Sequence, residues 1–338
     1  MTLPSQIDKY RLIKRLGGES FSEVYLSHDQ ALASNTAIKL IKIDNPSDIP
    51  SLIQEAQILY ECRHKHVVEI REANAFHVGA DYYLVFGLEY LPEGSIEGEM
   101  KTRWMSVKES CIRVSHVLSG LQYAHSKNYL HRDIKPGNIL IDGNSSKLSD
   151  FGLASMKSLY TACTMSYHPH CPPEYFLMQT PTVLFDIFAI GVTLFRIANN
   201  YSNWRAQIAI LANLEDILKK GALIQKIGYQ KFIPRKLKRI INRACRTDPS
   251  KRYQDAMSFK NDLDSLRFYI DWVRLSVGNW QGTQDSDSYE LKIIPVRNQF
   301  NVEFKKNMRC VKSRCSDHST FDSANEKVET IISETIFL

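Results

Sequence analysis

Four side chains in the middle of the chain have the types and spacing needed to transfer a phosphoryl group. Asp133, Lys135 and Asn138 lie within six residues, and Asp150 follows seventeen residues after Asp133. A carboxylate can accept the proton that a hydroxyl loses as it attacks phosphorus, and a lysine can neutralise the charge that develops on the transferred group. Carboxylate and carboxamide oxygens are also ligands that Mg²⁺ prefers. These residues alone indicate phosphate transfer with one base and two magnesium ligands.

The patterns around this segment predict an α+β protein with two lobes. Over residues 10–88 the apolar residues mostly alternate, which is typical of β-strands, and one helix starting near Ser51 interrupts them. From Ser106, which begins a capping box, the apolar residues recur at steps of three and four, as in helices. We therefore expect a β-rich N-terminal lobe over residues 1–91 and a helical C-terminal lobe over residues 92–277.

A third, smaller unit is predicted toward the C-terminal end. Residues 282–288 are polar and rich in turn-forming types, which indicates a break between units. Beyond the break, residues 289–296 and 300–304 alternate like two strands, and residues 328–336 place apolar side chains on one helical face. We expect residues 278–338 to form a small α/β extension that either binds a partner or docks on the two preceding lobes.

Composition and charge argue against several classes of protein. The formal charge of +6 comes from 43 basic and 37 acidic residues, and no basic stripe indicates a nucleic-acid partner. Residues 1–16 lack the apolar core of a signal peptide. The most apolar stretch, residues 183–198, contains charged residues and is shorter than the roughly 20 residues of a membrane helix, so we expect a buried helix there and no membrane segment.

The seven cysteines are scattered and lack the spacing of a disulfide framework. This pattern favours a reducing cytoplasm. Cys310, Cys315 and His318 could form part of a zinc site, but a fourth ligand at ordinary spacing is missing. Small buried or surface thiols are the preferred interpretation.

Three motifs occur in an order that resembles the protein kinase family of the eukaryotic serine/threonine type. Residues 129–141 contain the H-R-D-x-K-x-x-N pattern of a catalytic loop, residues 150–152 read Asp-Phe-Gly, and residues 36–39 resemble the V-A-I-K strand. The resemblance covers about residues 10–270 and implies a bilobal protein kinase fold, to which the small α/β extension predicted from the pattern of residues 278–338 is added.

The resemblance implies catalytic and metal-binding roles for the four side chains. Asp133 would be the catalytic base, and Lys135 would contact the transferred phosphate. Asn138 and Asp150 would hold Mg²⁺. A lysine at position 135 resembles serine/threonine kinases rather than tyrosine kinases.

The resemblance also implies a binding site for ATP. Lys39 would hold the α- and β-phosphates, and the carboxylate of Glu55, or alternatively Glu61, would fix its rotamer. Lys42 is the competing lysine, but its odd offset from Lys39 puts it on the opposite face of the strand. The remaining residues expected to bind ATP are Leu16, Gly17, Gly18, Val24, Ala37, Glu89, Leu91 and Leu140.

The chain departs from the family pattern at several positions. Glu19 and Ser22 replace two glycines of the nucleotide loop, and a carboxylate near phosphate weakens ATP binding unless it points outward. Tyr167 stands where serine/threonine kinases usually have a threonine. Thr161 and Thr164 in the same segment are expected sites of regulatory phosphorylation, with free surface hydroxyls as the alternative.

Three distant residues resemble the scaffold of the large lobe. The resemblance implies that Glu174 pairs with Arg252 and that Asp186 tethers the catalytic loop. Buried charges of this kind are tolerated only as pairs.

We therefore expect a cytoplasmic protein kinase that transfers the γ-phosphate of Mg·ATP to serine or threonine hydroxyls of protein substrates, itself included. Two other interpretations stay open. A pseudokinase that binds nucleotide as a scaffold is favoured by Glu19 and Ser22, and a small-molecule kinase is disfavoured by Lys135 and Arg252. A purified protein that transfers no phosphate but still binds nucleotide would favour the pseudokinase.

Overall fold

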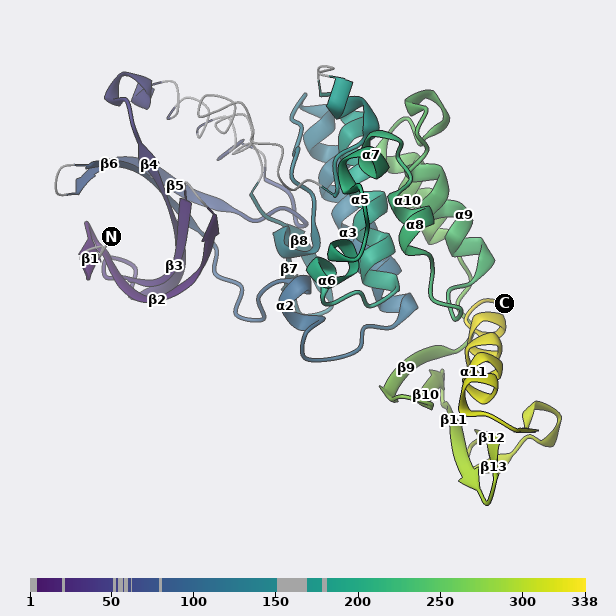
Figure 1. The fold of residues 1–338 in the computed structure, drawn as a ribbon. Coiled ribbons are helices and arrows are strands. Elements are labelled where there is room, and N and C mark those ends of the chain that lie inside the picture. Colours follow the sequence, from purple (N-terminus) through teal and green to yellow (C-terminus); the bar gives the residue numbers. More distant parts are fainter. Residues whose placement is uncertain are drawn as a thin grey trace.

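The computed structural model describes residues 5–19, 22–50, 53, 57, 60–61, 63–78, 81–150, 169–177 and 181–338. A curled sheet forms the N-terminal part, helices form the middle, and a small sheet with one helix forms the C-terminal part (Figure 1). This arrangement confirms the predicted α+β class with a β-rich lobe followed by a helical lobe.

The N-terminal lobe is one curled antiparallel sheet. Its strands are β1 (Gln6–Ile7), β2 (Tyr10–Glu19), β3 (Ser22–Asp29), β4 (Ser34–Ile43), β5 (Ile70–Val78) and β6 (Asp81–Leu88), with the 3₁₀ turn η1 (Pro46–Asp48) after β4. The strands are ordered β1-β2-β3-β4-β6-β5. The alternation in β4 sends Leu40 and Ile41 into separate apolar clusters on the two faces of the sheet. The register places Lys39 opposite Val24 on one side and Phe86 on the other, so Lys39 lies in the middle of the sheet.

The C-terminal lobe is built around two long helices. Its elements are α2 (Ile96–Glu99), α3 (Val107–Ser126), η2 (Pro136–Asn138), β7 (Ile139–Asp142), β8 (Ser145–Leu148), η3 (Pro173–Leu177), α5 (Val183–Ala198), α6 (Trp204–Ala209), α7 (Leu214–Lys219), α8 (Leu223–Ile227), α9 (Arg235–Ala244), η4 (Pro249–Lys251) and α10 (Ala256–Asp264). The helix α3 begins as the capping box predicts, because Ser106 Oγ accepts a hydrogen bond from the Glu109 amide at 3.0 Å. The helix α5 is buried along nearly its whole length, as expected for residues 183–198. None of the helices described here combines the length and the apolar character that a membrane crossing requires.

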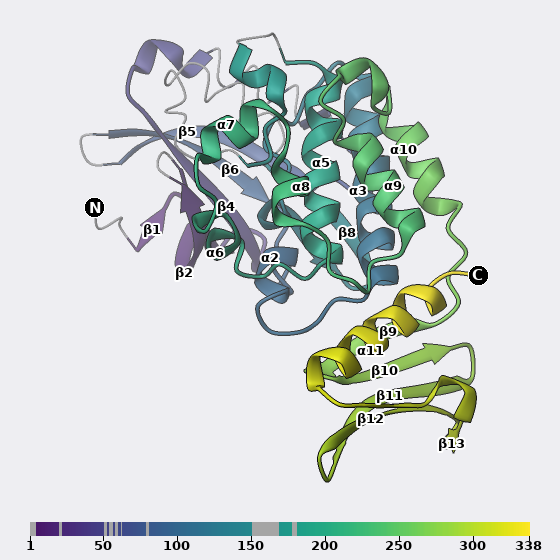
Figure 2. The same cartoon turned by 45° about the vertical axis from the view of Figure 1, so that its right-hand side comes forward.

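The C-terminal unit is an antiparallel sheet with one helix across it (Figure 2). Its elements are β9 (Asp271–Ser276), β10 (Asn279–Gln284), β11 (Asp287–Val296), β12 (Gln299–Lys306), β13 (Arg309–Cys310), η5 (Lys312–Arg314), β14 (Ser316–His318) and α11 (Phe321–Thr335). The polar residues 282–288 form the end of β10, the turn at residues 285–286 and the start of β11 rather than a linker. Because β9 pairs with β10 across the boundary expected at residue 278, the sheet begins at Asp271.

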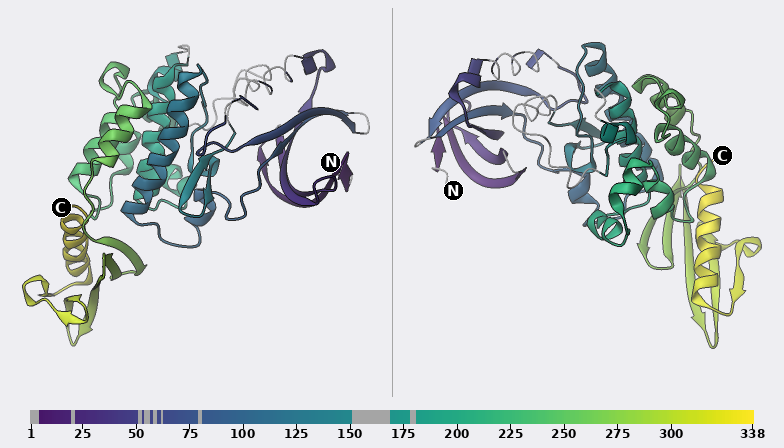
Figure 3. Two further views of the ribbon diagram at one scale, coloured as in Figure 1. Left: turned by 180° about the vertical axis from the view of Figure 1, so that it is seen from behind. Right: turned by 45° about the horizontal axis from the view of Figure 1, so that its top comes forward.

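A contact that we call the aromatic seam joins this unit to the helical lobe. The ring of Trp280 lies 5.4 Å from the rings of both Trp104 and Phe232, centroid to centroid, and the guanidinium of Arg274 lies over Trp104 at 5.3 Å. The aromatic seam consists of these four residues. The core of the unit is continuous with the core of the helical lobe, and the unit extends from the end of that lobe farthest from the N-terminal sheet (Figure 3).

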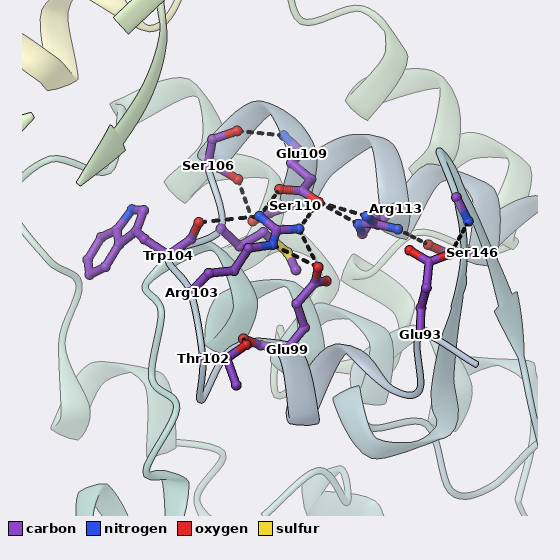
Figure 4. A network of polar contacts seen from close by, with 12 residues as sticks. Glu93, Glu99, Thr102, Arg103, Trp104, Ser106, Glu109, Ser110, Arg113 and Ser146 are labelled. Carbon is purple, nitrogen blue, oxygen red and sulfur yellow. Dashed lines mark hydrogen bonds and ion pairs between the residues drawn. The ribbon is translucent and has the colours of Figure 1, made fainter. Parts of the chain in front are cut away.

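A polar network attaches the start of α3 to β8 (Figure 4). Arg103 contacts the carboxylates of Glu99 and Glu109, and Glu109 Oε1 also accepts a hydrogen bond from Arg113 Nε at 2.8 Å. From the same guanidinium, Nη1 donates to the Ser145 carbonyl at 3.1 Å. The buried Arg113 therefore holds the β7–β8 hairpin, which precedes Asp150, against α3 by hydrogen bonds.

Candidate active site

The catalytic-loop residues predicted from sequence lie together in the structure. Lys135 Nζ is 3.0 Å from Asp133 Oδ2. Asn138 Nδ2 donates to the same oxygen at 3.1 Å and to the Asp133 carbonyl at 2.8 Å. The side chains of Asp133 and Lys135 are about a quarter to a third exposed, so a substrate hydroxyl can reach them. These contacts hold the carboxylate of Asp133 in one orientation.

A buried carboxylate on α5 anchors this loop. Asp186 is fully buried and accepts hydrogen bonds from the backbone amides of His131 and Arg132, each at 2.8 Å. The same carboxylate contacts His125 Nε2 at 2.8 Å. Arg132 has a φ of +66°, an uncommon conformation for a residue with a side chain. The tether predicted for Asp186 is present, and it stabilises the strained backbone just before Asp133.

Asp150 lies against the N-terminal lobe. Its Oδ1 is 2.8 Å from Lys39 Nζ, so an ion pair joins the centre of the N-terminal sheet to the C-terminal lobe. His131 Nε2 contacts the Ser149 carbonyl at 2.8 Å, and the Ser149 amide donates to the Asn138 carbonyl at 2.9 Å. The backbone before Asp150 is therefore fixed to the catalytic loop, and Asp150 itself has a φ of +64°.

Part of the predicted site lies outside the described residues. Glu55, the expected partner of Lys39, is one such residue. Thr161, Thr164 and Tyr167 also fall there. So do Ser20 and Phe21 of the nucleotide loop, and residues 151–152, which complete the Asp-Phe-Gly motif.

The described part of the nucleotide loop belongs to the β2–β3 hairpin. Gly17 pairs with Val24, and Ser22 pairs with Glu19 at the end of the hairpin. Gly18 has a φ of +148°, and a Cβ atom there would lie 2.4 Å from the Ser22 carbonyl oxygen. Gly18 is therefore required by its backbone, whereas a Cβ on Gly17 would meet open space.

The other residues expected to bind ATP come from three strands and the segment after β6. Ala37 on β4 is buried and pairs with Leu88 of β6, and Leu16 on β2 is exposed. Leu140 lies on β7, where it forms a bridge with Ser95. Leu91 is half-buried in the segment after β6.

Two charged residues near this site have partners of their own. Glu89 accepts from Lys147 Nζ at 2.6 Å and from the Glu69 amide at 2.8 Å, so its side chain ties the segment after β6 to β8. Lys42 pairs with Asp81 at 2.8 Å. These contacts leave Lys39 as the lysine that faces Asp150.

Sequence reasoning missed two residues that support the site. His125 contacts Asp186, and Arg113 clamps β8. The spacing of Glu109 and Arg113 is a signal for a helical ion pair, but the contact of Arg113 with β8 depends on the tertiary structure.

The arrangement can carry out in-line transfer of a phosphoryl group. A carboxylate, a lysine and a carboxamide meet at one loop, and a second carboxylate faces a buried lysine across the lobes. The side-chain nitrogen Nδ2 of Asn138 donates to Asp133, so the side-chain oxygen Oδ1 of Asn138 is the atom that a cation could bind. The donor set of Asn138 and Asp150 therefore fits Mg²⁺.

Comparison with known proteins agrees with this geometry. A family model described as a protein kinase domain matches residues 10–262. Serine/threonine-protein kinase PrkC of Bacillus subtilis is 27% identical over 301 residues, which cover 85% of this chain and 44% of that protein. The probable serine/threonine-protein kinase PknB of Lactococcus lactis is 27% identical over 266 residues, which cover 76% of this chain and 42% of that protein. A third relative, mitogen-activated protein kinase kinase kinase 3 of Arabidopsis thaliana, is 31% identical and covers 69% of this chain and 37% of its own length. The chain thus spans less than half the length of these relatives.

Proposed function

Because the chain belongs to the protein kinase family, we propose that it transfers the γ-phosphate of ATP to serine or threonine hydroxyls of protein substrates. The observation that carries this proposal is the contact of Asp133 with Lys135 and Asn138 on a loop anchored to Asp186. Two of the relatives named above, PrkC and PknB, carry the name serine/threonine-protein kinase, and Lys135 two residues after Asp133 supports the same substrate class.

In this proposal each side chain has one task. Asp133 accepts the proton of the substrate hydroxyl, and Lys135 neutralises charge on the transferred phosphoryl group. Lys39 binds the α- and β-phosphates. Mg²⁺, held by Asn138 and Asp150, would offset the negative charge of the phosphates.

The proposal includes the nucleotide-binding residues and a location for the activity. Glu55, outside the described residues, would hold Lys39 once ATP is bound. The residues that would surround the nucleotide lie on the strands and in the segment after β6, namely Leu16, Gly17, Gly18, Val24, Ala37, Glu89, Leu91 and Leu140. A cytoplasmic location would supply ATP, and it agrees with the free thiols of the cysteines that the structure describes.

A phosphotransfer assay tests this function. Purified protein is incubated with Mg²⁺ and ATP labelled on the γ-phosphate, and labelled residues are identified by mass spectrometry. We expect label on serine or threonine, including Thr161 or Thr164, and loss of the label in Asp133→Ala. Asp142→Asn is the matched control, because Asp142 is an exposed carboxylate nearby whose described partner is Lys147.

Two results would contradict the proposal. Label that persists in Asp133→Ala would exclude Asp133 as the base. Absence of label in the unmodified protein, with nucleotide binding still seen by thermal shift, would exclude catalytic turnover and leave a nucleotide-binding scaffold.

A further inference from the structure

Two thiols touch at the outer edge of the C-terminal unit. Cys310 ends β13, and Cys315 follows the 3₁₀ turn η5 that reverses the chain. Their sulfur atoms are 3.4 Å apart, Cys310 is exposed, and Cys315 is partly buried. We propose that Cys310 and Cys315 form a reversible dithiol–disulfide couple that exchanges with low-molecular-weight disulfides such as oxidised glutathione.

The surrounding backbone holds the two thiols in contact. Cys310 pairs with Lys305 of β12. The sulfur of Cys315 lies 3.5 Å from both the Phe304 amide nitrogen and the Val311 carbonyl oxygen. Both cysteines are therefore held against the same strand, and their sulfur atoms, 3.4 Å apart, need to approach by about 1.4 Å to reach the length of a disulfide bond.

His318, the third residue of the possible zinc site, has other partners in the structure. The two ring nitrogens of His318 lie 2.8 Å from Ser316 Oγ and Ser323 Oγ, so this ring is engaged by hydroxyls. Within the described part of the chain, no group of three histidine, cysteine or acidic residues could hold a metal ion. Chemistry between the two thiols is the alternative that the contact supports.

Two of the other described thiols, Cys111 and Cys245, have different surroundings. Cys111 is buried in the core of the helical lobe, and Cys245 donates to the Phe188 carbonyl. Burial raises the pKa of both thiols well above the ordinary value, which suppresses the reactive thiolate. Cys310 is exposed and has a second sulfur within contact distance, so it differs from both.

Oxidation of the two cysteines takes place by two successive thiol–disulfide exchange reactions. The thiolate of Cys310 attacks one sulfur of oxidised glutathione, which forms a mixed disulfide and releases one glutathione thiolate. The thiolate of Cys315 then attacks Cys310 Sγ and displaces the second glutathione. The two protein thiols are oxidised, the glutathione disulfide is reduced, and the two protons leave with the two glutathione thiols. Because the hydrogen bond with Cys315 raises the pKa of Cys310, the exchange should become faster as the pH rises above neutral.

The positions of basic residues allow a direct test by mass spectrometry. The folded full-length protein is incubated with oxidised glutathione, free thiols are alkylated, and the protein is digested with trypsin without reduction. Trypsin cleaves after Arg309, Lys312, Arg314 and Lys327. A disulfide would therefore join the tripeptide 310–312 to the peptide 315–327, a product that one linear peptide cannot mimic.

We expect this joined peptide to become the main form of both cysteines and to disappear after dithiothreitol. In Cys315→Ser, which removes the resolving thiol, Cys310 should retain one glutathione, and circular dichroism would confirm that this variant is folded. The proposal is overturned if both cysteines remain alkylated, if each keeps a separate glutathione, or if Cys310 joins mainly to another cysteine. The test does not depend on kinase activity, and Asp133 lies in another part of the molecule.

Discussion

The buried ion pair between Glu174 and Arg252 should be the strongest single polar contact in the helical lobe. The guanidinium is fully buried, and Glu174 accepts from Arg252 Nη1 at 2.6 Å and from Nη2 at 2.7 Å. Arg252 also donates to the carbonyls of Arg246, Leu184 and Thr247, at 2.6, 3.1 and 3.2 Å. All five guanidinium donors therefore have an acceptor.

Removing one charge of this pair leaves the other buried without compensation. Glu174→Gln and Arg252→Met should each lower the free energy of unfolding by about 3–5 kcal/mol. At about 2–4 °C per kcal/mol for a unit of this size, each change should lower the Tm by about 6–20 °C. The double variant Glu174→Gln with Arg252→Met should lose much less than the sum of the single losses, because it leaves neither charge buried.

Thermal unfolding followed by circular dichroism measures all three variants. The matched control is Glu215→Gln, which breaks an exposed ion pair with Lys219 on α7 and should cost below about 1 kcal/mol. If Glu174→Gln lowered the Tm no more than Glu215→Gln does, the reasoning from burial would be refuted. Strictly additive losses in the double variant would show that the two residues are not coupled.

Three further results are expected. Burial lowers the pKa of His66 to about 4 in the folded protein, whereas the ordinary value is 6.5. Between these two pH values the unfolded chain binds a proton that the folded protein does not, so the free energy of unfolding falls as the pH drops from 6.5 toward 4. The free energy of unfolding measured with urea should be lower at pH 5 than at pH 7 by up to about 2 kcal/mol, and this difference should be smaller in His66→Gln. Gly18→Ala should lower the Tm, whereas Gly17→Ala, whose Cβ would meet no other atom within 4 Å, should leave the Tm unchanged; equal losses of Tm would contradict the Cβ clash at Gly18. Arg113→Met should lower the free energy of unfolding by about 2 kcal/mol, and Arg113→Lys should lower it less. An unchanged Tm in Arg113→Met would show that its hydrogen bonds to β8 do not stabilise the fold.

Residues that act through local spacing were predictable from the sequence. The cap of α3 follows from Ser106 and Glu109, because both groups lie within one helical turn. Asp133 and Asn138 meet for the same reason, since one loop carries both. The motif order also predicted the pairing of Glu174 with Arg252 and the tether at Asp186.

Contacts that depend on tertiary structure were not predictable in this way. The residues of a hairpin turn and of a linker are of the same types, so residues 282–288 resembled a boundary between units although they join two paired strands. The ion pair of Lys39 with Asp150 joins residues that are 111 positions apart, and no local pattern indicates it. The contact of the two thiols at 310 and 315 likewise requires the turn η5 to be known.

The aromatic seam has a consequence for how this chain can change over generations. Trp104 and Phe232 lie within the region that matches the family model, residues 10–262, whereas Trp280 and Arg274 lie beyond it. A smaller side chain at Trp280 would leave a cavity beside Trp104 and Phe232, and a larger ring at Phe232 could fill part of it. Substitutions on the two sides of the aromatic seam should therefore covary among relatives. A chimera that takes its C-terminal unit from a relative should fold stably only when the contacting residues of the helical lobe come from the same relative.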